Sequence, residues 1–540
     1  MSILNRVKEW VVGDNAPLSD VKSVRRWLTT LPANDPMKLL QEISAALQGL
    51  NEQNNLKNPI RLEIIYLLDE AAIGPRNRLL REYLSQSRLP SFRENALWMA
   101  IHQYWARLAA AYGICLEQAQ ADRSHHLPAD QLLQFVIRGL YAGRHWIKWR
   151  LLRYATVEGH QWRLVARFYV VAENNKLSTT THLIYAGTAT ETSAQNELLK
   201  MLLLGISATD GLLPVQTEIA SRIIEFVVME CEWSEAYSPA AGFCYNVIGD
   251  LPPMRIQGAP SDSGVWRFFG GQGAVASLES IRSETLKGNL KSGLQLGGDY
   301  SLRQVQLVTE HLLRYWVHPL PERRSERETT YCRIEVIHGF AEVVRHFLQC
   351  QKTQNDSLSE LAAAPSLDNN EEIEVVIPPA EQNEVDMHDF ATTARQESWV
   401  VQNISATGLG ALVTMVSGDW LRVGRLIALA FQENSPEWRV AVIRRLHQTN
   451  HGATYVGLEI LAEKILPAKI RLLGMSLHDD EYSLVLDEYL GSQLKILTRV
   501  GTLDAVTRAE IDIDMTYAIS VANWVEKGDS FDLAICDKNS

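Results

Sequence analysis

The spacing of hydrophobic residues changes once along this chain, and that change limits the folds open to it. From about residue 16 to residue 235 apolar side chains recur every three to four positions, which is typical of amphipathic helices. After about residue 395 apolar and polar residues alternate, which is typical of half-buried strands. The pattern predicts a multidomain α+β protein in which a helical half is followed by antiparallel strands.

The clearest helix of the first half begins at Asp35-Pro36. An aspartate can accept hydrogen bonds from the free amides of a first turn, and a proline at the first helical position loses no bond. No fixed sequence period relates this helix to the later ones, so residues 1–240 are expected to form helical hairpins and not a regular repeat. The apolar face of this helix consists of Leu39, Leu40, Ile43, Leu47 and Leu50.

Two segments of different composition connect the helical half to the strands. Residues 241–350 mix short strand-like runs with helical ones, the last of each being RIEVIHGF and residues 302–316. Residues 351–394 carry ten acidic groups and one lysine, together with small and polar residues. Such a segment buries too little apolar surface to offset chain entropy, so it is expected to be a disordered linker or insertion.

The strand-rich part is expected to form two small units. Residues 395–466 contain five strand-like runs separated by turn signals, a pattern that predicts a small antiparallel barrel. Residues 467–540 repeat the style and are expected to form a second small β domain.

The charge and the cysteines restrict the function. The formal charge is −12, which argues against general binding to DNA or RNA, although the segment 351–394 holds most of that excess and leaves room for a local basic site. The six cysteines show no CxxC pair or zinc spacing, so reduced thiols and no metal site are expected. No apolar run approaches the ~20 residues that span a bilayer, and the N-terminus lacks a signal-peptide core, so a cytoplasmic protein is expected.

The sharpest local signal is the segment Asn403-Ile404-Ser405-Ala406-Thr407-Gly408-Leu409-Gly410. A strand is expected to end at Asn403, whose side chain can fold back on the turn; Ser405 offers a hydroxyl, and Gly408 permits a geometry that a Cβ would block. Such a polar corner on a barrel could read the edge of a planar ligand by hydrogen bonds. A plain turn between strands explains the same residues.

The stretches NISATGLGALV, LRVGRLIALAF, WRVAVIRRL and YVGLEIL together resemble the PilZ family over roughly residues 395–466. The family pattern is an Asn or Asp, any residue, Ser, two residues and Gly on a six-stranded barrel. The resemblance implies binding of cyclic di-GMP, a bacterial second messenger, with Asn403, Ser405 and Gly408 forming the barrel-face half of the ligand site.

In PilZ proteins the other half is an RxxxR element upstream, whose guanidiniums clamp phosphates and guanine edges. Here the matching element, Arg323, Arg324 and Arg327, lies far upstream and directly before the strand-like CRIEVIHGF. We hypothesise that this strand is the first strand of the barrel and that residues 340–394 are an insertion. The entropic cost of closing a loop grows only slowly with its length, so a long insertion is tolerated. The alternative is a solvated charged loop.

Other motifs carry less weight. The segment 144–154 interleaves cations with aromatics, but its spacing suggests a helix with aromatics toward a core and cations toward water. Gly270-Gly271-Gln272-Gly273 follows a strand without completing a phosphate-binding fingerprint. No catalytic signature appears, so neither an enzyme nor a cofactor is expected.

These observations favour a cyclic di-GMP receptor that relays the signal to an unknown protein partner through its helical half. The alternative is an interaction scaffold whose degenerate PilZ-like barrel binds no nucleotide.

Overall fold

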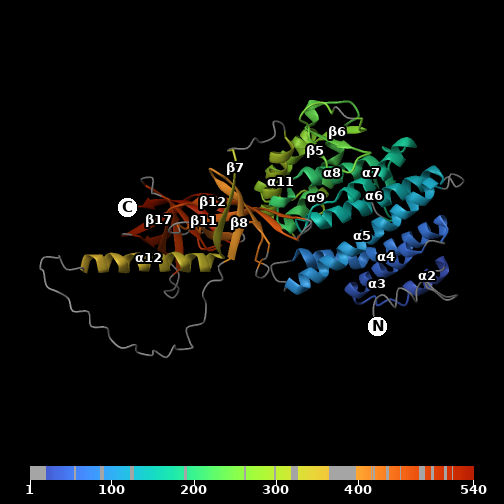
Figure 1. The fold of residues 1–540 in the computed structure, drawn as a ribbon. Helices are drawn as coiled ribbons and strands as arrows, with labels where there is room; N and C mark the ends of the chain where they lie inside the picture. The colour runs from blue at the N-terminus through green and yellow to red at the C-terminus, as the bar shows by residue number, and fades with distance from the viewer. Residues whose placement is uncertain are drawn as a thin grey trace. The chain divides into compact units, whose positions relative to one another are not determined.

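The computed structural model describes residues 20–539, and the chain divides into two compact units, Met1–Glu322 with His447–Asn450 and Arg323–Leu446 with His451–Ser540 (Figure 1). The division between Glu322 and Arg323 falls within residues 241–350, which were expected to form a single mixed segment. The gaps in the description are 54–55, 86–90, 122–126, 188–190, 261–262, 297–299, 318–325, 364–396, 415, 417–419, 433–436, 450–451, 473–480, 488–491, 504–507, 514 and 529.

The first unit is mainly helical, as the apolar spacing predicted. The Asp35 side chain accepts a hydrogen bond from the Lys38 amide and Pro36 opens the helix, so the predicted start is correct. Among the described residues, none of the helices is both long and apolar enough to cross a bilayer. The main helices are α2 (Val21–Leu28), α3 (Pro36–Glu52), α4 (Asn58–Leu84), α5 (Ser91–Ala121), α6 (Ala129–Leu151), α7 (Gly159–Asn174), α8 (Ala194–Ile206) and α9 (Pro214–Val227).

A small antiparallel sheet and two further helices complete this unit. The sheet has the order β3-β6-β4-β5, and α11 occupies the residues that the periodicity indicated. Its elements are β3 (Glu232–Ser234), β4 (Phe243–Asn246), β5 (Met254–Arg255), β6 (Trp266–Gly270), α10 (Val275–Leu286) and α11 (Leu302–Trp316), and the short strands β1 (His182–Leu183) and β2 (Glu191–Thr192) form a separate pair.

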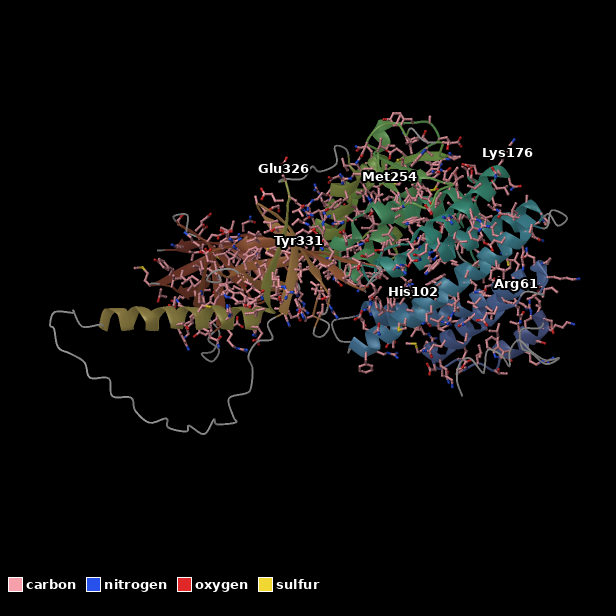
Figure 2. All side chains as sticks on the ribbon, viewed as in Figure 1. Arg61, His102, Lys176, Met254, Glu326 and Tyr331 are labelled. Atoms are coloured by element: carbon pink, nitrogen blue, oxygen red, sulfur yellow. The ribbon has the colours of Figure 1, made fainter. Side chains whose placement is uncertain are left out.

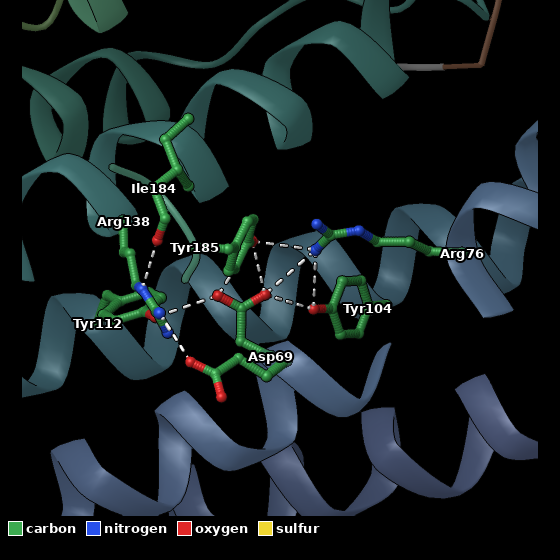
Figure 3. Close-up of polar contacts among 8 residues, drawn as sticks. Asp69, Arg76, Tyr104, Tyr112, Arg138, Ile184 and Tyr185 are labelled. Atoms are coloured by element: carbon green, nitrogen blue, oxygen red, sulfur yellow. Dashed lines mark hydrogen bonds and ion pairs between the residues drawn. The ribbon is translucent and has the colours of Figure 1, made fainter. Parts of the chain in front are cut away.

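A buried polar cluster around Asp69 joins α4, α5 and the segment after β1 (Figure 3). The Asp69 carboxylate accepts hydrogen bonds from the hydroxyls of Tyr104 at 3.0 Å, Tyr112 at 3.3 Å and Tyr185 at 2.9 Å. It also pairs with the Arg76 guanidinium at 3.1 Å. Burial, reinforced by the Asp69 charge, raises the pKa of all three tyrosines well above its usual value, so they remain donors. Every oxygen of the carboxylate is satisfied, and the cluster is a packing element of the unit.

The cations of α6 lie inside the unit, and the prediction that they would face water was wrong. Arg144 pairs with Glu197 at 3.0 Å and with Glu225 at 2.7 Å, while Lys148 pairs with Glu218 at 2.7 Å. Burial alone would raise the pKa of Glu225, but the charge of Arg144 lowers it to about 2. The acidic partners come from α8 and α9, about 50–80 residues away, so local spacing could not reveal them.

His102 on α5 gives the unit a pH-dependent stability. Burial, with help from the charge of Arg150, lowers its pKa from 6.5 to about 4. Between these values only the unfolded chain takes up the proton, so the stabilisation is complete above pH 6.5 and is lost as the pH falls toward 4. His102→Phe keeps a ring against Trp98, which stacks on His102 at 4.6 Å, and removes the proton.

We therefore expect the free energy of unfolding to fall between pH 7 and pH 5 by roughly 1–2 kcal/mol less in His102→Phe than in the wild type. Urea unfolding at the two pH values measures both losses. Equal losses in the two proteins would contradict this role of His102.

The second unit begins with a closed six-stranded barrel. Strand β7 pairs with both β8 and β10 and so belongs to this barrel. The chain between β7 and β8 includes α12, whose Val343 and Phe347 pack on the hydrophobic core that the barrel shares with its neighbour. The strands are β7 (Glu328–His338), β8 (Glu397–Ser405), β9 (Gly408–Val413), β10 (Leu426–Phe431), β11 (Arg439–Gln448) and β12 (Thr454–Ala462), and α12 spans Phe340–Ala363.

Residues 351–363 therefore continue α12, and the prediction of a linker beginning at 351 was wrong for them. The remainder of that predicted linker, 364–394, lies outside the described residues.

A second closed barrel follows, with the same connectivity as the first. Numbered from its own first strand, each barrel has the order 1-2-3-6-5-4, with strand 4 closing on strand 1. The two barrels are thus topological repeats, which gives the predicted second β unit a definite fold. Its strands are β13 (Ile465–Leu472), β14 (Glu481–Leu486), β15 (Gln493–Thr498), β16 (Arg508–Asp512), β17 (Thr516–Lys527) and β18 (Asp532–Asn539).

The two barrels pack as one body. A shared apolar cluster includes Leu426 and Val440 of the first barrel and Leu484 and Leu533 of the second. At its edge the Arg444 guanidinium binds both carboxylate oxygens of Glu526, at 2.8 and 2.6 Å, and also pairs with Glu459 at 2.6 Å. This two-point ion pair fixes β11 against β17.

Candidate functional site

The predicted site residues that the structure describes fall at one end of the first barrel. Asn403 and Ser405 lie on β8, and Gly408 begins β9. Arg327 is exposed and directly precedes β7, whereas Arg323 and Arg324 lie outside the described residues.

The strand register brings the two halves of the motif together. Glu328 pairs with Ile404, and Thr329 pairs with Asn403. Because Arg327 directly precedes Glu328 and the strands are antiparallel, its backbone lies beside the Asn403–Ser405 end of β8. Residues some 75 positions apart thus meet at one edge of the barrel, in the arrangement that the first-strand hypothesis requires.

A β-bulge turns the Asn403 side chain toward the outer face of the barrel. Val401 pairs with Ala411, but Asn403, and not Gln402, pairs with Gly410. Val401 and Ala411 point into the core, so in a regular register Asn403 would follow an outward Gln402 and point inward. The inserted residue reverses this, which is a frequent use of bulges near binding sites.

The Asn403 amide is held from one side only. Its Nδ2 donates a hydrogen bond to the Tyr455 hydroxyl on β12 at 2.9 Å. The sequence suggested that the Asn403 side chain would fold back on the turn, but it reaches toward β12 instead. Its Oδ1 is buried and has no hydrogen-bond partner among the described residues. A buried acceptor without a donor is costly, and a ligand N–H would satisfy it.

Ser405 and Gly408 shape the turn between β8 and β9. The Ser405 hydroxyl donates to the Gly408 carbonyl at 3.0 Å, which closes the turn. A Cβ on Gly408 would lie 2.2 Å from the Leu458 carbonyl oxygen, while its φ is outside the left-handed region. Glycine is therefore needed for close approach of β12, not for an unusual backbone conformation.

Two glycines lie next to Asn403 on the outer face of the barrel. Gly410 pairs with Asn403 on one side and with Gly457 of β12 on the other. Neither glycine adds a side chain, and Arg445 of β11 lies against Gly457, whose Cβ would be 3.2 Å from the Arg445 Cβ. Gly410 is itself buried, because the Tyr455 side chain lies over it: a Cβ on Gly410 would be 1.9 Å from the Tyr455 hydroxyl oxygen.

A second bulge lies on β7, between Thr329 and Cys332. Tyr331 within it is 82% exposed; Figure 2 labels Tyr331 and also Glu326, which precedes the strand. An exposed ring, Tyr331, thus lies on the strand that pairs with Asn403, and a cation, Arg327, lies directly before that strand.

The second barrel lacks these features at the equivalent place. Its strands 2 and 3 are joined by Asp487-Glu488-Tyr489-Leu490-Gly491-Ser492, which does not have the Asn-x-Ser-x-x-Gly spacing. No arginine occurs in the residues 460–464 that precede its first strand. The barrel fold therefore does not require the Asn-x-Ser-x-x-Gly motif, because the second barrel forms without it.

The glycine turn after β6 is occupied by an acidic side chain. The Gly273 amide donates to Glu232 Oε1 at 2.5 Å. A carboxylate at this helix start takes the position that a phosphate would need, so the turn is not a phosphate site.

Sequence reasoning missed Tyr455 and Gly410. Tyr455 reads as an ordinary strand residue, and its contact with Asn403 depends on the register across β8, β9 and β12. A glycine within a strand can indicate close approach of another group, so Gly410 carried a usable signal.

Residues 22–236 match the family model described as the N-terminal domain of the cyclic-di-GMP receptor FimW. This segment covers the helices of the first unit through α9 and ends before the barrels. No curated protein matches the chain.

Proposed function

We propose that this chain is a cyclic di-GMP receptor whose first barrel is of the PilZ type and binds the nucleotide through Arg323, Arg324, Arg327, Asn403, Ser405 and Gly408. The observation that carries the proposal is the β7–β8 register, which sets Arg327 beside the Asn403–Ser405 end of β8. The match of the helical segment to a receptor of the same nucleotide supports it independently.

The residues suit the chemistry of the ligand. Cyclic di-GMP carries two phosphodiesters, and arginine forks form charge-assisted, two-point bonds to phosphate oxygens. The unpartnered Oδ1 of Asn403 is an acceptor for the N–H groups of a guanine edge.

The relay is the second part of the proposal. Contacts of the anionic phosphates with Arg327 and the neighbouring arginines would be made only in the bound chain, and this differential contact would carry the signal from the first barrel toward the helical unit. The helical unit would then present the signal to a protein partner. We propose a cytoplasmic setting, in which the six cysteines, none of them in a disulfide, remain thiols.

Calorimetric titration of the full chain with cyclic di-GMP tests the proposal. We expect saturable binding in the micromolar range or tighter, weakened about tenfold by Ser405→Ala because the β8–β9 turn loses the bond that closes it. Ser492→Ala is the matched control, since Ser492 is an exposed serine at the equivalent turn of the second barrel. Equal affinities of Ser405→Ala and wild type would argue against the site.

A scaffold without nucleotide binding is the second candidate. The second barrel favours it, because it keeps the same connectivity without the ligand motif. Flat titration heats from a folded chain would select the scaffold over the receptor.

A further inference from the structure

An exposed tyrosine of β7 lies diagonally across from Asn403 on the outer face of the first barrel. We infer that the Tyr331 ring stacks on a base of the bound dinucleotide while Asn403 accepts a hydrogen bond from the edge of that base. The inference rests on the proposed function and adds to it a ligand-contacting residue that belongs to neither half of the sequence motif.

The strand pattern places the Tyr331 ring on the face that carries the Asn403 side chain. Ile334 and Val336 of β7 are fully buried and point into the barrel. Side chains alternate along a strand, so Tyr331, three positions before Ile334, lies on the outer face. Thr329 pairs with Asn403, and Tyr331 follows Thr329 by two residues. Such diagonal neighbours lie about 7–8 Å apart in a regular strand pair, a separation that an aromatic side chain can reach across.

The Tyr331 ring is open to a ligand. The β7 bulge sets Thr330 and Tyr331 opposite Gln402, and bulges often re-aim a side chain beside a binding site. The pairing of β7 with β10 ends at Ile334, so among the described strands only β8 pairs with this part of β7. Within the described part of the chain, no residue bonds the Tyr331 hydroxyl and no ring stacks on it.

Stacking and edge recognition use different parts of a base. A hydrogen bond to Asn403 Oδ1 lies near the plane of the base, whereas a stacked ring covers its face, so one base can make both contacts at once.

Two arginines flank the Tyr331 ring along the chain. Arg327 precedes it by four residues, and the exposed Arg333 follows it by two on the same face of β7. Rings interleaved with arginines are a usual means of holding nucleotides, because the ring stacks on a base and the cations contact phosphates. This strand therefore offers a base platform between two cations.

Substitutions at residue 331 test the stack by calorimetric titration of the full chain with cyclic di-GMP. We expect Tyr331→Ala to weaken binding about tenfold, the scale on which alanine replaces a stacking ring. Tyr331→Phe and Tyr331→Trp keep a ring and should bind within about twofold of the wild type. Tyr331→Leu keeps apolar bulk but has no π face, so it should bind about as weakly as Tyr331→Ala.

Tyr482→Ala is the matched control, because it removes a half-exposed tyrosine from the second barrel. Its affinity for cyclic di-GMP should equal that of the wild type. Since the Tyr331 side chain is exposed, its variants should melt close to the wild type, and melting curves verify that each chain is folded.

The outcomes distinguish this inference from the proposed function. A folded wild-type chain that does not bind cyclic di-GMP overturns the proposed function. Wild-type binding with an unchanged affinity in Tyr331→Ala overturns the role of Tyr331 and leaves the receptor proposal standing. Equal affinities of Tyr331→Leu and Tyr331→Phe, whether both are tight or both are weak, overturn stacking as the contact that Tyr331 makes.

Discussion

Replacing Arg327 with alanine is expected to lower the affinity for cyclic di-GMP about 100-fold, the effect of losing one partner of a charge-assisted contact. Arg327 is the described arginine of the RxxxR element, and the β7–β8 register puts it beside Asn403. Arg327→Lys should recover little, because an ammonium cannot make the planar, two-point contact of a guanidinium. Titration calorimetry at one fixed salt concentration measures both variants.

Arg471→Ala is the control for a general loss of positive charge. Arg471 lies on β13 of the second barrel, is half exposed, and pairs with Asp512. Its loss should leave the affinity within about twofold of the wild type, since exposed charges contribute little. If Arg327→Ala binds as tightly as Arg471→Ala, the arginine half of the site is wrong.

Asp69→Asn is expected to destabilise the helical unit by about 3–5 kcal/mol. The substitution leaves the buried Arg76 without its counter-charge and turns an NH2 group toward hydroxyls that donate to the carboxylate (Figure 3). Urea unfolding followed by the helical circular dichroism signal measures the loss.

The matched control is Asp250→Asn, which removes the exposed ion pair with Arg163. A surface pair of this kind contributes about 0–1 kcal/mol, so the control should unfold close to the wild type. Similar unfolding midpoints for the Asp69 and Asp250 variants would show that the Asp69 cluster does not hold the unit together.

Local patterns predicted the elements well where neighbouring residues decide the structure. The cap at Asp35, the helix at 302–316 and the two β units all follow from spacing over a few residues. The burial of Arg144 and Lys148 could not be predicted, because their acidic partners lie on α8 and α9. The acidic composition of residues 351–363 suggested a linker, so their helix was missed. They continue α12, whose first half packs on the core of the barrels, and such contacts are not visible in the composition.

The site was predictable to the extent that its motif is local. Asn403, Ser405 and Gly408 lie within six residues, and Arg327 was singled out by the strand that follows it. Tyr455, Gly410 and the two bulges depend on register across four strands, which a single sequence does not specify.

Hydrogen exchange of the full chain, with and without saturating cyclic di-GMP, tests whether the nucleotide binds at the first barrel. We expect slower exchange at 326–331 and 403–410 in the presence of the nucleotide, with no change at the equivalent 487–492 turn of the second barrel. Protection confined to the helical segment 22–236, with both barrels unchanged, would contradict it.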